Sequence, residues 1–270
     1  MKEKRILVTG PSPRGWHRLQ QVLECPAKYA WGYLDKDSKE EEKDPLVKGS
    51  LIHLGIAHFY QRRLEKQEKR DPDVFYKPKE AIRLYAEIAG GLSAKWADLA
   101  CEATDAYVKK HYHEKKRIIA VEHLAQGMIG GHLFTGRFDL VYADRRGRVY
   151  VEDHKSTVRI DPNQAKTYSI SGQMLGYTHL ARQTYGDRFA GMRVNLIQHT
   201  GDIRFKRFNL SPAPHMLRNF PKTVAYAEER IAFFRATHGD DPRNWPMISS
   251  ELMCQHRYGL CPHLEKCKWG

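Results

Sequence analysis

The sequence predicts an α/β (α+β) protein in which a mixed central sheet is flanked by helices. Strand-like runs joined by short glycine-containing turns fill the middle of the chain, and segments with helical periodicity precede and follow them. Because 270 residues with 41% hydrophobic side chains can bury one large core, we expect a single domain over residues 1–270. It divides into a mainly helical lobe (12–115), a sheet core (116–212) and a helix with a cysteine-rich tail (213–270).

Charge and cysteine content narrow the class of protein. The formal net charge of +13 favours a polyanionic partner, most often nucleic acid. We find no apolar run long enough for a membrane span and no signal-peptide core, so we expect a cytoplasmic protein without a membrane partner. Five cysteines, an odd number, argue against a disulfide framework and towards metal or cluster ligation.

The helical lobe contains two candidate functional residues. Ser12 and Pro13 predict a helix start, and the helix ends near Cys25, which is followed by Pro26. Residues 47–64 have helical periodicity and carry His53 on a mostly apolar face. On its own, Cys25 is typical of a buried thiol and His53 of a hydrogen-bonded core histidine. Residues 77–113 are also helical in composition, with a break at 89–93.

The sheet core contains the most informative stretch. Residues 118–124 and 127–134 read as strands, and runs at 137–143 and 148–155 flank a turn with Gly147, which predicts a β-hairpin. If the turn is centred on residue 146, Asp139 faces Asp153 and Arg137 faces Lys155. Since side chains alternate along a strand, Asp153 and Lys155 share one face, and residues 152 and 154 point to the other.

Opposed carboxylates destabilise a hairpin unless a cation lies between them. Mg²⁺ prefers oxygen ligands and is held by one or two carboxylates together with phosphate and water. Lys155 could then orient or help deprotonate a water and offset charge in a phosphoryl-transfer transition state. The alternative is an exposed hairpin whose charged side chains serve solubility alone.

These residues resemble a known family. Gly136-Arg-Phe-Asp139 followed by Glu152-Asp153-His154-Lys155 is similar to the core of the PD-(D/E)XK nuclease superfamily, specifically its RecB-like branch. The resemblance implies a restriction-endonuclease-like core and DNA as the substrate. It also implies Mg²⁺ or Mn²⁺ as the cofactor, with Asp139, Asp153 and Lys155 catalytic.

Other motifs extend the resemblance along the chain. Gly49 and His53 match a Gly-x-x-x-His helix that places its histidine beside the metal, so His53, Asp139 and Asp153 would be ligands. His154 would add only its backbone carbonyl. A helix opening at Asp161 and running towards Gln183 carries Gln-x-x-x-Tyr, and the resemblance implies that this pair contacts DNA and supports the site. The remaining candidates are Gln173 and Tyr177 as this pair, and Glu122 as a secondary residue near the metal.

The tail places three cysteines within a short segment that lacks apolar periodicity. Zn²⁺ or an iron-sulfur cluster would each require a fourth ligand, which could be His256, His263 or Cys25. The resemblance favours Cys25, because AddB-type and CRISPR-adaptation nucleases hold a [4Fe-4S] cluster with one N-terminal and three C-terminal cysteines. The spacing between the first two tail cysteines departs from that pattern. The predicted cluster ligands are Cys25, Cys254, Cys261 and Cys267, with zinc as the alternative metal.

Taken together, these motifs predict a bacterial or phage-encoded, metal-dependent DNA exonuclease with a structural [4Fe-4S] cluster. A helicase, or a partner in recombination, repair or CRISPR adaptation, would supply any unwinding. Two alternatives come from other classes. One is a nucleic-acid-binding module without catalysis, and the other is a zinc-stabilised scaffold subunit of a recombination complex.

Overall fold

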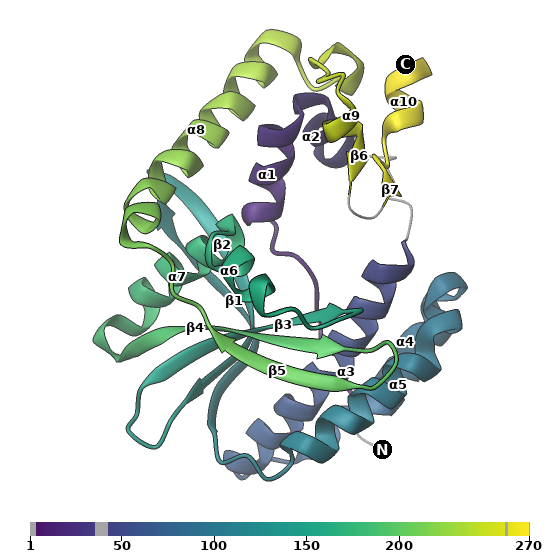
Figure 1. The fold of residues 1–270 in the computed structure, drawn as a ribbon, viewed down its shortest axis with the longest axis vertical. Helices are drawn as coiled ribbons and strands as arrows, with labels where there is room; N and C mark the ends of the chain where they lie inside the picture. The colour runs from purple at the N-terminus through teal and green to yellow at the C-terminus, as the bar shows by residue number, and fades with distance from the viewer. Residues whose placement is uncertain (1–3, 36–42, 257–258, 270) are drawn as a thin grey trace.

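A five-stranded mixed sheet forms the centre of the molecule (Figure 1). The computed structural model describes residues 4–35, 43–256 and 259–269. The strands follow the chain order β1-β2-β3-β4-β5; β3 and β4 run parallel, and every other neighbouring pair is antiparallel. The predicted fold class is therefore confirmed. The strands are β1 (Arg117–Ile129), β2 (His132–Ala143), β3 (Val149–Thr157), β4 (Phe189–Gln198) and β5 (Arg204–Asn209).

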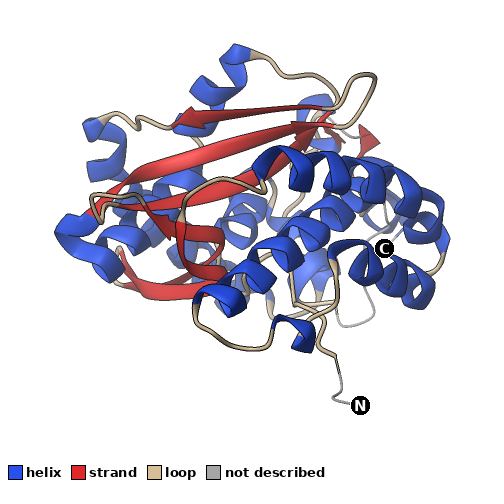
Figure 2. Ribbon diagram, turned by 90° about the horizontal axis from the view of Figure 1, so that it is seen from below, coloured by secondary structure: helices blue, strands red, loops and turns tan. Residues whose placement is uncertain are grey.

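Helices cover both faces of this sheet, as Figure 2 shows. One apolar core lies under α3 (Asp44–Gln67), α4 (Pro78–Ala89) and α5 (Gly91–His111). The other core lies on the opposite face, under α1 (Trp16–Glu24), α2 (Pro26–Tyr33), α7 (Gly172–Tyr185) and α8 (Pro214–His238). Among the described residues, no helix is long and apolar enough to cross a membrane.

The cysteine-rich tail folds as short elements beside α1 and α2 (Figure 1). The tail begins after the long helix α8, and Trp245 and Pro246 bring the chain back onto α2, where the Ala27 N–H donates to the Pro246 carbonyl. Helix α2 and the C-terminal tail thus meet at one end of the molecule. The tail elements are α9 (Glu251–Cys254), β6 (Gln255–His256), β7 (Gly259–Leu260) and α10 (Leu264–Trp269).

The first helices differ from the prediction. Ser12 does not cap a helix: its hydroxyl donates to the Thr135 carbonyl, and α1 begins only at Trp16. The segment before α1 instead lies along β2, because the Arg14 and Thr135 backbones also bond to each other. Residues this far apart in sequence give no local signal of such a contact.

The helix expected from Asp161 is two helices. Asp161 caps α6 (Pro162–Ser169) through a bond from the Asn163 N–H, as its position predicts. α6 then ends, and the Ser171 hydroxyl accepts from the Met174 N–H to start α7 afresh. A second N-cap directly before Gly172 explains why one long helix does not form.

The hairpin register is the predicted one near the turn, but it changes towards the site. Val141 pairs with Val151 and Leu140 with Glu152, after which β2 and β3 no longer pair. The expected cross-strand pairings of Asp139 with Asp153 and of Arg137 with Lys155 are therefore not formed. The Arg137 guanidinium instead donates to the carbonyls of Gly10 and Val8 in the N-terminal segment.

The strands are irregular where the predicted site lies. Phe138 and Val141 both belong to the core under α7, although strict alternation would place residues three apart on opposite faces. Opposite them, Glu122 of β1 has φ 49°, an unusual value for a residue with a side chain. Such irregularities in a sheet redirect side chains and are common beside functional sites.

Candidate active site

Three carboxyl groups from three adjacent strands converge on one cavity of about 290 Å³. β1 supplies Glu122, β2 supplies Asp139 and β3 supplies Asp153. Burial is the main cause that raises the pKa of Asp139 well above its usual value, and Asp153 and Glu122 raise it further. Burial likewise raises the pKa of Asp153, and it raises that of Glu122 to about 8. The protein alone therefore disfavours full ionisation of these three carboxyl groups.

Lys155 is the cation closest to this cluster. Its Nζ lies 2.8 Å from Asp153 Oδ2, and the side chain also lines the cavity. Although burial lowers the pKa of Lys155, Asp153 and Asp139 raise it above the usual value for lysine. The side chain therefore remains an ammonium, suited to stabilising negative charge on a phosphate rather than to accepting a proton.

His53 reaches the cluster from α3. Its Nδ1 lies 3.5 Å from Asp139 Oδ2. Burial, together with the charge of Lys155, lowers the pKa of His53 to about 3. A neutral imidazole next to a carboxylate is a form that can donate a lone pair to a metal ion.

The residue between the two β3 candidates contributes its backbone. The His154 N–H donates to Asp139 Oδ2 at 2.7 Å and fixes that carboxylate. The His154 side chain points to the opposite face of the sheet and is 2% exposed, as alternation along the strand predicts. Its ring lies 3.2 Å from the Asn195 side-chain amide.

Helix α7 supplies the last two predicted residues. Gln173 Nε2 donates to Asp153 Oδ1 at 3.2 Å and to the Tyr177 hydroxyl at 3.1 Å. The N-cap Ser171 fixes where α7 begins, two residues before Gln173. Gly136 of β2 has no side chain, so the Tyr177 ring can approach the sheet closely. A Cβ on Gly136 would lie only 2.7 Å from the Tyr177 ring. The pair thus supports the acid cluster from one side.

Sequence reasoning missed the far wall of this cavity. Gly10, Pro11 and Ser12 line it, and so do Trp16 and His17 near the start of α1. Only contacts distant in sequence, such as Ser12 with Thr135, place this segment there. The hydrophobic pattern before residue 15 offered no sign of them.

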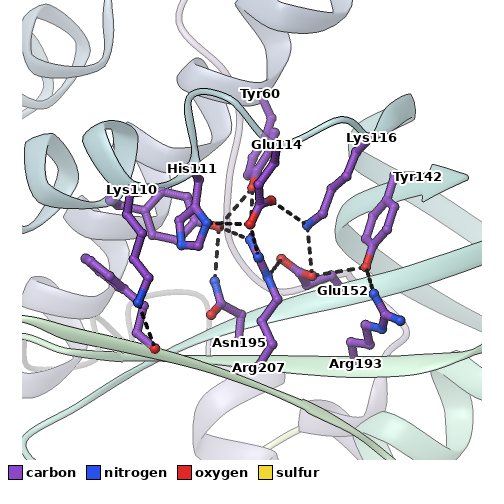
Figure 3. A network of polar contacts seen from close by, with 12 residues as sticks. Tyr60, Lys110, His111, Glu114, Lys116, Tyr142, Glu152, Arg193, Asn195 and Arg207 are labelled. Atoms are coloured by element: carbon purple, nitrogen blue, oxygen red, sulfur yellow. Dashed lines mark hydrogen bonds and ion pairs between the residues drawn. The ribbon is translucent and has the colours of Figure 1, made fainter. Parts of the chain in front are cut away.

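The opposite face of β3 carries a different network of charges (Figure 3). Glu152 is fully buried, and its carboxylate accepts from Arg207 at 3.0 Å and from Lys116 at 3.3 Å. Burial raises the pKa of Glu152, but Lys116 and Arg207 outweigh it and hold the pKa at about 2. Arg207 also bonds Glu114, which in turn contacts His111 at 2.7 Å.

The residues present fit a divalent cation in the acid cluster. Among the described residues, no three His, Cys, Asp or Glu side chains are arranged as a complete ligand set. Mg²⁺ does not require one, because it keeps several waters and takes phosphate oxygens as ligands. Asp139 and Asp153 would hold the ion, with His53 and the His154 carbonyl beside them. When bound, the ion would supply Lewis-acid activation of phosphate and water.

The cysteines of the predicted cluster gather at one end of the molecule. Burial raises the pKa of Cys267, and the thiols of Cys261, Cys25 and Cys254 are close enough to raise it further. The Ile248 N–H lies 3.5 Å from the Cys25 sulfur, and the Cys261 N–H donates to the Cys254 carbonyl. Among the described residues, these thiols are not arranged as a complete set of metal ligands. The side chain of His256 is not among the described ones.

A mixed sheet that presents Gly-x-x-Asp and Asp-x-Lys on adjacent strands is the arrangement expected of a phosphodiesterase. Residues 16–268 match the model of the PD-(D/E)XK nuclease superfamily, and the chain belongs to that superfamily. Membership implies hydrolysis of phosphodiester bonds.

Two of the solved structures that match the chain have low sequence identity to it. One is a provisionally assigned exonuclease from Eubacterium rectale, with 16% identity over 79% of this chain and 74% of that chain and a TM-score of 0.46. Another is the protein SSO0001, with 15% identity over 80% of this chain and 82% of that chain and a TM-score of 0.31. No curated protein matches the chain.

Proposed function

We propose that the protein is a Mg²⁺- or Mn²⁺-dependent nuclease of the RecB-like branch that hydrolyses DNA from strand ends. The observation that carries this proposal is the buried acid cluster, in which Asp139 and Asp153 lie together with Lys155 as the only cation paired to them among the described residues. A divalent cation would stabilise the ionised carboxylates, whose pKa values are raised by burial and, for Asp139, also by the charges of Asp153 and Glu122. The net charge of +13 supports nucleic acid as the substrate.

The residues of the site have separate roles in this proposal. Asp139, fixed by the His154 N–H, and Asp153, fixed by Gln173, orient the ligand oxygens. Lys155 keeps its proton and contacts the phosphate oxygens, where negative charge grows as the bond to the leaving group breaks. Tyr177 and Gln173 hold the substrate side of the cavity.

Digestion of end-labelled linear DNA tests the proposal. Single- and double-stranded substrates are incubated with Mg²⁺, Mn²⁺ or chelator, with wild type and Lys155→Ala compared. We expect metal-dependent products that are absent with Lys155→Ala, and early release of the label if the enzyme acts from ends. Binding of DNA without cleavage under both metals would reject catalysis and favour a binding module.

We further propose that Cys25, Cys254, Cys261 and Cys267 hold a structural [4Fe-4S] cluster. Two observations support a metal site here. The four thiols lie close together, and the Trp31 side chain bonds to the Cys267 thiol. Such a site would tie α2 to the tail and close a long loop of chain. Unpaired thiols of this kind suit a reducing cytoplasm, where we expect the protein to act.

Metal analysis after anaerobic purification tests the cluster. We expect iron and acid-labile sulfide in wild type, and the loss of both together with a lower unfolding temperature in Cys267→Ser. Cys101→Ser is the matched control, because Cys101 lies buried in α5, away from the tail. Zinc without iron or sulfide would show that the site is a zinc site, as in the scaffold alternative.

A further inference from the structure

A second, larger cavity adjoins the acid cluster. It has a volume of about 570 Å³ and lies between the start of α3, the end of β3, α6 and the turn after β4. His53 and Lys155 line both this cavity and the one that contains the carboxyl groups. The Lys155 side chain therefore borders both cavities.

The charge of this cavity suits a phosphate. Lys48 and Lys155 line it, together with His199, whose pKa is lowered by burial and by Lys48, and no Asp or Glu is among the described residues that do. The Lys48 ammonium lies 3.6 Å from the centroid of the Trp96 ring, a cation–π contact that restricts its position. A restrained ammonium in a cavity without carboxylates favours an anionic ligand.

The rest of the wall suits a sugar and a base. Leu46 of α3 and Val158 after β3 both line the cavity, and they are 53% and 61% exposed. Tyr168 of α6 adds an aromatic ring, and Gln164 adds a polar group that can bond to a base edge. A cavity of this volume holds one small-molecule ligand and not a duplex.

We propose that this cavity binds the nucleotide next to the scissile phosphate and that Lys48 contacts the phosphodiester on the far side of that nucleotide. The proposal rests on the proposed nuclease function and adds to it the path of the cleaved strand. Gly49 lets α3 approach β3 beside this cavity, because a Cβ there would lie 2.8 Å from the Ser156 hydroxyl. Lys48 is thus a binding residue for a phosphate that is not itself cleaved.

Phosphate neutralisation tests this contact. Single methylphosphonate linkages, which carry no charge, are placed one position to either side of each cleavage position in an end-labelled oligonucleotide, and cleavage rates are measured with Mg²⁺. For wild type we expect neutralisation on one side to slow cleavage by about 10-fold, the effect of losing a charged hydrogen bond. Lys48→Met, which keeps the apolar stem over Trp96, should cleave the unmodified strand about 10-fold more slowly and lose the sensitivity to that linkage.

Lys95→Met is the matched control. Lys95 also lies over Trp96, but it pairs with Asp44 and does not line the cavity, so this variant should keep the wild-type sensitivity. Equal sensitivity in wild type and Lys48→Met, or none in wild type, would overturn the proposed contact while leaving the nuclease intact. A wild type that does not cleave the unmodified strand would instead reject the nuclease function, and the contact with it.

Discussion

The two faces of β3 treat buried charge in opposite ways. On one face, Glu152 lies between Lys116 and Arg207, and its pKa is held at about 2. On the other face, burial raises the pKa of Asp153, and burial together with the charges of Asp153 and Glu122 raises that of Asp139. The first face is electrostatically complete within the protein, whereas the second lacks positive charge. Adjacent residues of one strand therefore separate a structural network from a site that needs a ligand.

The difference also explains how the site is built. Full pairing of β2 with β3 ends at Leu140 and Glu152, directly before the two aspartates. Beyond that point Asp139 bonds the His154 N–H with its side chain instead of continuing the ladder. The buried ion pairs on the opposite face hold β3 to β5 and to the segment before β1 while this ladder is interrupted.

The largest effect is expected on the face of β3 that carries Asp153, which we call the acid face. Asp139→Asn keeps an oxygen for the His154 N–H but removes a charge from the proposed metal site. We expect cleavage of DNA to fall by about 10²- to 10³-fold, the range for loss of one electrostatic group in an active site. Because the same change relieves repulsion, the unfolding temperature without metal should stay unchanged or rise, which thermal unfolding in chelator would measure. A less stable but fully active variant would contradict the comparison.

The next prediction concerns the opposite face of β3, where Glu152 is paired with two cations. Glu152→Ala leaves Lys116 and Arg207 buried without their carboxylate, so the free energy of unfolding should fall by about 3–5 kcal/mol. Denaturant unfolding measures this loss. Asp202→Ala is the control, since its pairing with Arg204 is exposed and its removal should change stability by less than about 1 kcal/mol. Similar losses in both variants would show that the buried network is not special.

The sequence predicts contacts between residues close in the chain, and it misses contacts between residues far apart in the chain. The register near Tyr142 and Tyr150, the faces of Asp153 and His154, and the Gln173–Tyr177 pair all follow from strand or helix spacing, and the structure has them. The partners of Glu152 do not, because Lys116 and Arg207 come from segments far apart in sequence. The positive φ of Glu122 is equally invisible to periodicity.

A pH series sharpens the comparison, because the two faces respond in opposite directions. Glu122 has its pKa raised to about 8, so its contribution to stability in metal-free protein is present below about pH 4.5 and lost as the pH rises to 8. Glu152 has its pKa lowered to about 2, so its contribution is present above pH 4.5 and lost as the pH falls to 2. The change should amount to about 5 kcal/mol for Glu122 and about 3 kcal/mol for Glu152.

Unfolding of three proteins in chelator across this range checks the signs. Glu122→Gln should reduce the loss on the alkaline side, to which Asp139 and Asp153 also contribute, and Glu152→Gln should remove the loss on the acidic side. An unchanged curve in either variant would mean that another group is responsible.

The smallest expected effect lies in the support of the acid face. Gln173→Ala removes the donor to Asp153 and to the Tyr177 hydroxyl, so cleavage should slow by about 10-fold without a comparable loss of stability. Gln183→Ala, on the same helix, loses only its bond to the Met128 carbonyl and should cleave at the wild-type rate. Equal rates for both variants would remove Gln173 from the site.

Metal binding tests the central claim most directly, that the acid face is a divalent-cation site. Carboxyl groups with raised pKa values must lose protons when a cation binds. Calorimetric titration of wild type with Mn²⁺ in two buffers of different ionisation enthalpy should therefore show binding whose heat depends on the buffer. That binding should be lost in Asp139→Asn and kept in Glu152→Gln. Binding of Mn²⁺ to Asp139→Asn with wild-type affinity and proton release would contradict the account.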